Sequence, residues 1–210
     1  MIGVLDLQGG VVEHLDHLER LEVPARRVKT AAELPGLAGL ILPGGESTCL
    51  GRLLRHHGLD TAIVEAHRRH GLAIWGTCAG AILLAARIAG ETPHLGLLDI
   101  TIRRNAYGSQ LDSFIATAAI PELDPDPVPL VFIRAPIITH TGPGVRVLLE
   151  LTGRIAAVEA GNLLATTFHP ELTPSLAFHR HFAALCGLRT GPAPAPAWSP
   201  ASWTRLAPIP

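Results

Sequence analysis

Ile74-Trp75-Gly76-Thr77-Cys78-Ala79-Gly80-Ala81 is the stretch of this 210-residue sequence from which the fold can be inferred. An apolar run, 72–75, leads into a Gly-x-Cys-x-Gly turn, and a second apolar run, 81–89, follows with helical composition. This pattern is typical of a nucleophile elbow, in which a strand turns sharply into a helix and presents one side chain at the apex. Glycines at both flanks keep a crowded turn free of β-carbons, and a cysteine beside a helix N-terminus is stabilised as its thiolate. The other interpretation of Cys78 is a small buried cysteine at the end of a strand.

Strands and helices alternate on the N-terminal side of this turn. Apolar runs predict strands at 2–7, 23–29 and 37–42, in addition to the strand of the elbow. Helices are predicted between them: one in which Val11, Val12, Leu15, Leu18 and Leu21 recur at helical spacing, one capped by Ser47 or Thr48, and one over 61–70. This alternation predicts a parallel, doubly wound sheet with ligands outside the carboxyl ends of its strands.

The regular alternation of strands and helices ends after the elbow. Short strands without long helices between them are predicted at 98–103, 111–119, 129–134, 145–151, 154–159 and 163–168, and a helix at 174–186. We interpret these strands as antiparallel and mixed additions to the parallel core. The expected fold is therefore α/β: a doubly wound, mostly parallel sheet with added antiparallel strands. One domain is expected over 1–188, and the Pro/Ala-rich tail, 189–210, is expected to be extended or disordered.

Composition excludes several classes of function. The net charge of −1 provides no attraction for nucleic acid. No apolar run approaches the ~18 residues of a membrane span, and no charged segment precedes the first strand as in a signal peptide. Three cysteines without framework spacing favour a reducing, cytoplasmic setting. Lys29 is the only lysine, which leaves little opportunity for chemistry through a lysine imine.

Two further segments could complete a site around Cys78. His169 follows the apolar strand 163–168, and in an extended segment Glu171 would face the same side and could orient it as the base of a cysteine nucleophile. A surface His-Pro-Glu turn is the alternative when this segment is considered alone. The turn at Gly44-Gly45 could aim backbone N–H groups at an oxyanion, as could the N–H of Ala79. A phosphate-binding loop is set aside because its lysine is absent.

Several histidines at helical spacing could suggest metal binding. They have no carboxylate or cysteine partner in the pattern, so surface histidines are the favoured interpretation. The residues concerned are His67, His70, His179 and His181. No metal site is predicted.

Three motifs resemble the class I glutamine amidotransferase family. They are Gly76-Thr77-Cys78-Ala79-Gly80, Pro43-Gly44-Gly45-Glu46-Ser47-Thr48 and Phe168-His169-Pro170-Glu171-Leu172-Thr173. Within that family, four stretches resemble the glutaminase subunits of pyridoxal 5′-phosphate synthases: Leu7-Gln8-Gly9, Arg104-Asn105-Ala106-Tyr107-Gly108, Asp112-Ser113-Phe114 and Phe132-Ile133-Arg134-Ala135-Pro136. The resemblance covers residues 1 to about 188 and implies a flavodoxin-like three-layer sandwich. The chain departs from the family at Ser109, where members often carry an arginine, so contacts from this loop are not carried over.

The resemblance implies a role for each motif. Cys78 would be the nucleophile, with His169 and Glu171 completing a triad. The L-glutamine substrate would be held by Gly45, Glu46 and Ser47, by Arg104 at its α-carboxylate, and by the backbone at Ile133 and Arg134. The amides of Gly45 and Ala79 would form the oxyanion hole. Spacing alone allows Arg104 to be a solvated arginine instead. No cofactor or metal is implied.

The resemblance also implies a partner. Ammonia released from glutamine would pass to a separate (β/α)₈-barrel synthase subunit, in a multimeric complex that assembles pyridoxal 5′-phosphate (vitamin B6). Gln8 to Gly10 and the following helix are candidate contacts with it. One alternative is the glutaminase subunit of another amidotransferase, such as imidazole glycerol phosphate synthase. Another is a catalytically silent regulatory domain, which the presence of Cys78, His169 and Glu171 disfavours.

Overall fold

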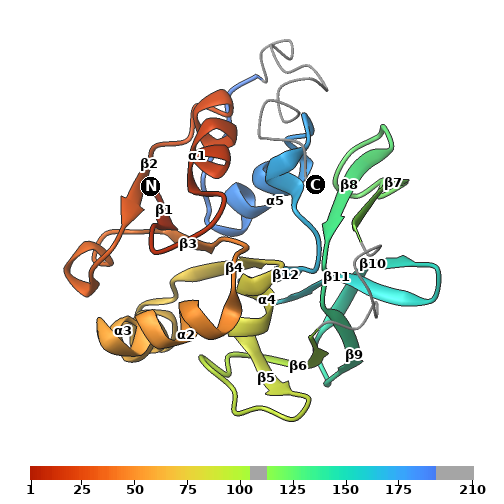
Figure 1. The fold of residues 1–210 in the computed structure, drawn as a ribbon. Coiled ribbons are helices and arrows are strands. Elements are labelled where there is room, and N and C mark those ends of the chain that lie inside the picture. Colours follow the sequence, from red (N-terminus) through yellow and green to blue (C-terminus); the bar gives the residue numbers. More distant parts are fainter. Residues whose placement is uncertain (105–112, 193–210) are drawn as a thin grey trace, which may run out of the picture.

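A 10-stranded sheet runs through the described residues, 1–104 and 113–192, of the computed structural model (Figure 1). Five neighbouring strands are parallel: β2 (Ala25–Val28), β1 (Ile2–Leu5), β3 (Gly39–Leu42), β4 (Ala73–Thr77) and β12 (Leu163–Thr166). All residues of β1, β3, β4 and β12 are buried, as expected for strands covered on both faces. Their carboxyl ends therefore meet at one edge of the sheet, where the candidate site residues follow β3, β4 and β12.

The sheet continues beyond β12 with mainly antiparallel pairing. The order is β11 (Arg154–Ala160), β9 (Ile137–Thr141), β6 (Leu98–Arg103) and β5 (Ala85–Ile88), with β10 (Arg146–Leu151) paired to β11. Strands β7 (Ser113–Ala118) and β8 (Val128–Ile133) form a separate antiparallel hairpin. The expectation of antiparallel strands added to a parallel core is confirmed, although β9 was not predicted.

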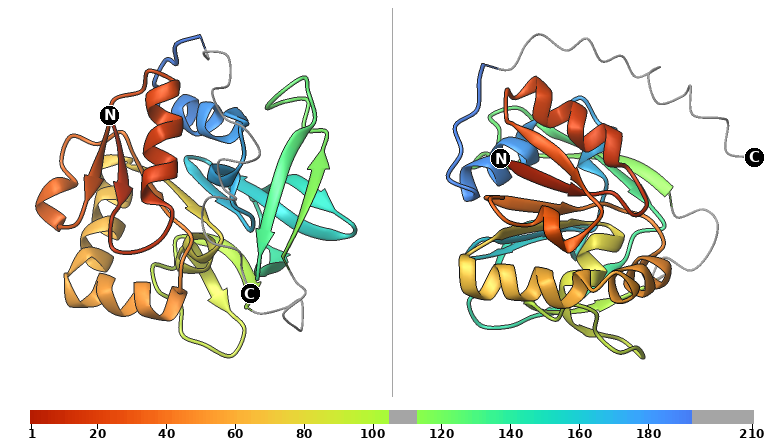
Figure 2. Two further views of the ribbon diagram at one scale, coloured as in Figure 1. Left: turned by 45° about the horizontal axis from the view of Figure 1, so that its top comes forward. Right: turned by 90° about the vertical axis from the view of Figure 1, so that its left-hand side faces the viewer.

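Helices cover both faces of the parallel half (Figure 2). On one face, α1 (Val11–Arg20) and α5 (Ala177–Leu185) pack on residues such as Ile41 and Trp75. On the other, α2 (Ser47–His56), α3 (Leu59–His70) and α4 (Ala79–Leu84) pack on Leu40 and Leu42. Alternate residues of each strand thus belong to different cores. The short 3₁₀ turns are η1 (Ala31–Glu33) and η2 (Pro170–Leu172). The predicted α/β three-layer architecture is confirmed.

The helix predicted over 81–89 is wrong in length and position. Helix α4 ends at Leu84, and Ala85 adopts an extended conformation (ψ 135°) that begins β5. Strand β5 pairs in parallel with β6, and Arg87 donates hydrogen bonds to Thr101 and Asp99. The alanine-rich run favours a helix by intrinsic propensity, but strand pairing in the tertiary structure overrides that weak preference.

Two details of the predicted helices also differ. The α1 face expected from its apolar spacing is rotated, because Val12 is 60% exposed whereas His14 and His17 are buried. Helix α2 is capped by Glu46 and not by Ser47 or Thr48: the Glu46 carboxylate accepts hydrogen bonds from the backbone N–H groups of Thr48 and Cys49. A side-chain acceptor at this position satisfies amides that have no partner within the helix.

Some predictions concern residues outside the described part of the chain. These are residues 105–112, with most of the Arg-Asn motif and Ser109, and residues 193–210 of the Pro/Ala-rich tail. Among the described helices, none combines the length and the apolar character needed to cross a membrane.

Candidate active site

Cys78 occupies a strained turn between β4 and α4. Its backbone has φ 47° and ψ −103°, a conformation that residues other than glycine rarely adopt. A β-carbon on Gly76 would lie 2.3 Å from the Gly80 carbonyl, and one on Gly80 would lie 1.9 Å from the Leu42 carbonyl oxygen. Only glycine fits at either position, so the elbow predicted from the sequence has its physical reason in close backbone packing.

A pocket of about 440 Å³ opens beside the Cys78 side chain at the carboxyl ends of the parallel strands. Every predicted substrate-binding and oxyanion residue lines it, together with Cys78 and His169; the predicted lining residues are Gly45, Glu46, Ser47, Ala79, Arg104, Ile133 and Arg134. Gln8, Ile82 and Pro136 line it as well. The sequence therefore predicted most of the pocket wall, although its segments come from six separate parts of the chain.

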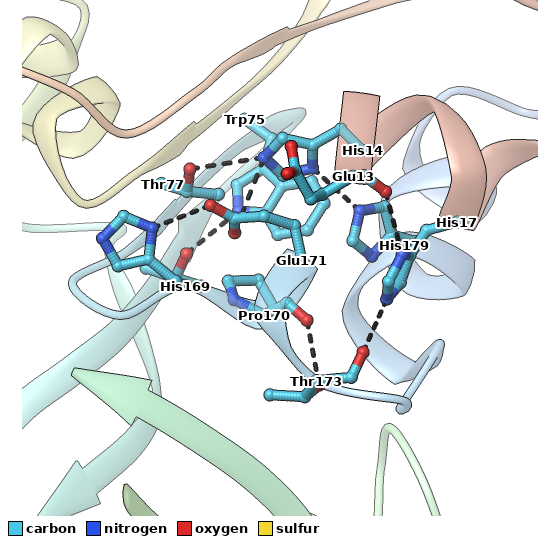
Figure 3. A network of polar contacts seen from close by, with 11 residues as sticks. Glu13, His14, His17, Trp75, Thr77, His169, Pro170, Glu171, Thr173 and His179 are labelled. Carbon is cyan, nitrogen blue, oxygen red and sulfur yellow. Dashed lines mark hydrogen bonds and ion pairs between the residues drawn. The ribbon is translucent and has the colours of Figure 1, made fainter. Parts of the chain in front are cut away.

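His169, which lines this pocket, forms a hydrogen-bonded pair with Glu171 (Figure 3). His169 Nδ1 lies 2.7 Å from Glu171 Oε1, and the side chain of Glu171 is buried. The backbone N–H of His169 donates to the carbonyl of Val131 in β8 at 2.8 Å, which ties the loop to the hairpin. The alternative of an exposed His-Pro-Glu turn is thereby excluded.

The charges of this pair are coupled. Burial alone would lower the pKa of His169, but the Glu171 carboxylate, the neighbouring Cys78 side chain and the hydrogen bond with Glu171 raise it well above its usual value. Burial alone would raise the pKa of Glu171, whereas His14 and His169 lower it. A histidine that lies beside a thiol and is hydrogen-bonded to a carboxylate can hold the proton that the thiol gives up.

The two residues predicted to form an oxyanion hole, Gly45 and Ala79, both line the pocket. Ala79 is the first residue of α4, so its N–H has no carbonyl one turn earlier to bond. Gly45 has φ 152° and lies in the loop after β3. Donors of this kind, held by the backbone before reaction, stabilise the charge that develops on a carbonyl oxygen.

Arg104 reaches the pocket wall from the end of β6. Its guanidinium contacts Glu46 at 3.0 Å, Glu91 at 3.0 Å and the Thr48 hydroxyl at 2.8 Å. The alternative of a freely solvated arginine is excluded by these contacts. A carboxylate ligand could replace one of the protein carboxylates, because a guanidinium binds such groups through a planar fork of donors.

Gln8, a candidate contact with a partner, lines the pocket, a position that the sequence pattern did not predict. Its Oε1 accepts a hydrogen bond from the Glu46 N–H at 3.2 Å, which connects the loop after β1 to the loop after β3. Gly44 has a role that spacing could not predict: a β-carbon there would lie 2.4 Å from His169 Cε1. The position of Gln8 directly after a buried parallel strand was the available signal.

The interpretation of His179 as a surface residue is wrong. His14, His17 and His179 are all buried between α1 and α5, and the His14 Nδ1 and His179 Nε2 atoms lie 2.8 Å apart. Burial lowers the pKa of His14 to about 4 and that of His179 well below its usual value, so both are neutral at pH 7. Within the described residues, no group of three or more His, Cys, Asp or Glu side chains is arranged to hold a metal ion.

A model of the SNO glutamine amidotransferase family matches residues 4–187. The chain belongs to this family. Relatives include the pyridoxal 5′-phosphate synthase subunit PdxT of Syntrophus aciditrophicus, 58% identical over 99% of this chain and 94% of the relative. The corresponding subunit of Deinococcus radiodurans is 51% identical over 90% of this chain and 98% of its own length.

Two solved structures are similar to this chain, one in sequence and fold and the other in fold. A crystal structure of a glutamine amidotransferase has a TM-score of 0.84 at 43% identity, and the match covers 89% of this chain and 99% of that one. A glutamine amidotransferase from Thermotoga maritima matches with a TM-score of 0.55 at 11% identity over 89% and 93% of the two chains. The second match supports the fold alone.

Proposed function

We propose that this chain hydrolyses L-glutamine to L-glutamate and ammonia and supplies the ammonia to the synthase subunit of a pyridoxal 5′-phosphate synthase. One observation carries the proposal: Cys78 and His169, which is hydrogen-bonded to Glu171, line one pocket together with Gly45, Ala79 and Arg104. Family membership and the names of the relatives agree with this activity. Their names favour this synthase over that of imidazole glycerol phosphate.

The mechanism follows from the positions of the groups. The Cys78 thiolate attacks the carbon of the side-chain amide, and the N–H groups of Ala79 and Gly45 bind the oxygen as it gains charge. His169, protonated by the thiol, gives its proton to the departing ammonia. The glutamyl thioester is then attacked by water, which His169 deprotonates, and glutamate leaves as the thiol of Cys78 is restored.

Arg104 supports recognition of an amino acid as the substrate. Its guanidinium would pair with the α-carboxylate, while Glu46, Ser47 and the backbone at Ile133 and Arg134 would surround the rest of the molecule. The only lysine, Lys29, forms an ion pair with Asp6 and lies outside this pocket. Ammonia would therefore leave for another subunit, which we propose to be a (β/α)₈-barrel synthase in a multimeric complex. The three free cysteines suit a reducing cytoplasm.

Release of glutamate from glutamine in the presence of the barrel subunit tests the proposal. We expect release with the wild-type chain and none with Cys78→Ala. Cys186→Ala is the matched control, because this thiol packs against Gly39 at the other end of β3. Absence of release, or release that Cys78→Ala does not diminish, would contradict the enzymatic function. Release that only an imidazole glycerol phosphate synthase barrel supports would identify the other amidotransferase.

A further inference from the structure

One oxygen of the Glu171 carboxylate is buried without a hydrogen-bond partner. Oε1 is bonded by His169, but Oε2 has no partner among the described residues. A buried carboxylate with one bare oxygen is costly unless positive charge or a polar hydrogen faces it. The group that faces it is Nε2 of His14, at 3.6 Å (Figure 3). This distance exceeds that of a hydrogen bond, so the contact is one between a charge and a dipole.

His14 is held firmly in this orientation. It projects from α1 with no solvent exposure and packs edge-on against Trp75, with ring centroids 5.5 Å apart. Its Nδ1 lies 2.8 Å from Nε2 of His179 in α5, and its Nε2 lies 3.5 Å from the Thr77 hydroxyl. The imidazole therefore has one nitrogen toward α5 and the other toward the triad.

The surroundings select one tautomer of a neutral His14. If Nδ1 carried the proton, the Nε2 lone pair would face the Glu171 carboxylate, and His179 would carry its own proton on Nδ1. That Nδ1 is buried without a partner in the described structure, so a buried donor would be left unsatisfied. If instead both histidines carry their proton on Nε2, the Nε2–H of His179 donates to Nδ1 of His14, and the Nε2–H of His14 faces Glu171. The only group then left without a partner in the described structure is the lone pair on His179 Nδ1.

We propose that His14 is a positioning residue for the triad, whose Nε2–H keeps the Glu171 carboxylate ionised and aimed at His169. The inference deepens the proposed function and rests on it. Because burial lowers the pKa of His14 to about 4, the imidazole acts as a neutral dipole at pH 7. Removing the dipole weakens the support that Glu171 gives to a protonated His169, so His169 accepts the proton of the Cys78 thiol less readily.

Other charged or titratable groups lie around His14 and Glu171, and the test must leave them unchanged. They are His169 from the loop before η2, Cys78 from the elbow, His17 and Arg20 from α1 and His179 from α5. The test variants therefore change only residue 14, and they differ in whether its side chain carries a nitrogen and where that nitrogen lies. His14→Phe keeps a ring without nitrogen. His14→Gln places an amide N–H near the position of Nε2, whereas the shorter side chain of His14→Asn reaches only the His179 side.

Two measurements test the proposal. Glutamate release with the barrel subunit gives kcat and the KM for glutamine, and mass spectrometry of the full chain alone gives the rate at which iodoacetamide alkylates Cys78 across pH. For His14→Phe we expect kcat to fall about tenfold with KM within twofold, because His14 touches no substrate. We expect the midpoint of Cys78 alkylation to rise by about half to one pH unit. His14→Gln should restore most of kcat and most of the wild-type alkylation midpoint, whereas His14→Asn should resemble His14→Phe in both quantities.

Leu18→Ala provides the control for damage to α1, because Leu18 is buried on the same helix and belongs to its apolar core. We expect it to lower the stability without moving the alkylation midpoint. Three outcomes would overturn the role of His14. The midpoint of Cys78 alkylation could be unchanged in His14→Phe, or Leu18→Ala could shift it equally. His14→Asn could also recover kcat and the midpoint as fully as His14→Gln. If the wild-type chain releases no glutamate, the proposed function fails, whereas the alkylation profiles need no substrate and still decide the role of His14.

Discussion

Nδ1 of His169 lies 2.7 Å from Oε1 of Glu171, although only Pro170 separates the two residues. The proline starts η2, where its fixed φ suits the first helical position, and this turn brings both side chains to the same side. The pair is thus built locally, whereas the Cys78 thiol of the proposed triad lies between β4 and α4, about ninety residues earlier in the chain. Parallel pairing of β4 with β12 brings the two segments together.

Glu171→Gln is expected to reduce kcat/KM by roughly 10²- to 10⁴-fold. The amide keeps the size of the side chain but removes the charge that raises the pKa of His169, so the imidazole holds the proton of the thiol less well. Glutamate release with the barrel subunit measures the effect. Glu159→Gln removes the carboxylate from another His–Glu pair, with His181, and should leave the rate unchanged. A Glu171→Gln enzyme within threefold of wild type would show that the carboxylate has no role in the triad.

Gly44→Ala is expected to abolish most of the activity while the chain still folds. The new β-carbon would lie 2.4 Å from His169 Cε1 and 3.4 Å from the Cys78 β-carbon, so it would push the base away from the thiol. Gly58→Ala is the control: its φ of 63° strains a side chain, but no atom of the described residues lies within 4 Å of the new carbon. That variant should lose about 1 kcal/mol of stability with normal glutamate release. Normal release by Gly44→Ala would mean that His169 need not occupy its observed position.

Arg104→Gln is expected to raise the KM for glutamine roughly ten- to hundredfold, the effect of losing one or two hydrogen bonds to a charged group. The alkylation rate of Cys78 should stay near that of wild type, because the guanidinium contacts Glu46, Glu91 and Thr48 and its proposed role is to bind substrate. Arg87→Gln removes a comparable exposed ion pair, with Asp99, away from the pocket and serves as the control. An unchanged KM in Arg104→Gln would refute its assigned role.

The buried histidines should make the protein less stable in mild acid. Burial lowers the pKa of His14 from 6.5 to about 4 and also lowers that of His17 and His179. The unfolded chain therefore binds more protons than the folded chain below pH 6.5, and stability is lost as the pH falls towards 4. For His14 alone the full loss is about 3 kcal/mol. Urea unfolding at pH 7, 6 and 5 measures the trend.

The pH trend has an internal control. His169 has a raised pKa, so its stabilising contribution is present below pH 6.5 and is lost only as the pH rises through its folded pKa. The two effects therefore occupy different pH windows. His179→Phe should flatten the slope below pH 6.5 without changing the trend above it. Equal stability at pH 7 and pH 5 in the wild-type chain would contradict the prediction that the histidines are neutral when buried.

The N-terminal α/β pattern was largely predictable, because buried parallel strands are short apolar runs and their helices begin at recognisable turns. Predictions from the sequence pattern alone were wrong where tertiary packing determines the conformation or the burial of a residue. Ala85 to Ile88 has helical composition but pairs with β6 as a strand. The spacing of α1 favoured Val12 as a buried residue, yet His14 and His17 are buried instead because His179 and the Thr173 carbonyl provide polar partners between α1 and the C-terminal segment.

The sequence by itself determined the elbow, the His-x-Glu pair and the glycine turn after β3. Their chemistry depends on residues close together in the chain, and steric limits on the backbone leave few other conformations. The tertiary structure alone decided that Gln8 lines the pocket, that Arg104 is held by Glu46 and Glu91, and that His14 faces the second oxygen of Glu171. These contacts join segments far apart in sequence, so they exist only once the sheet and its two layers of helices have packed.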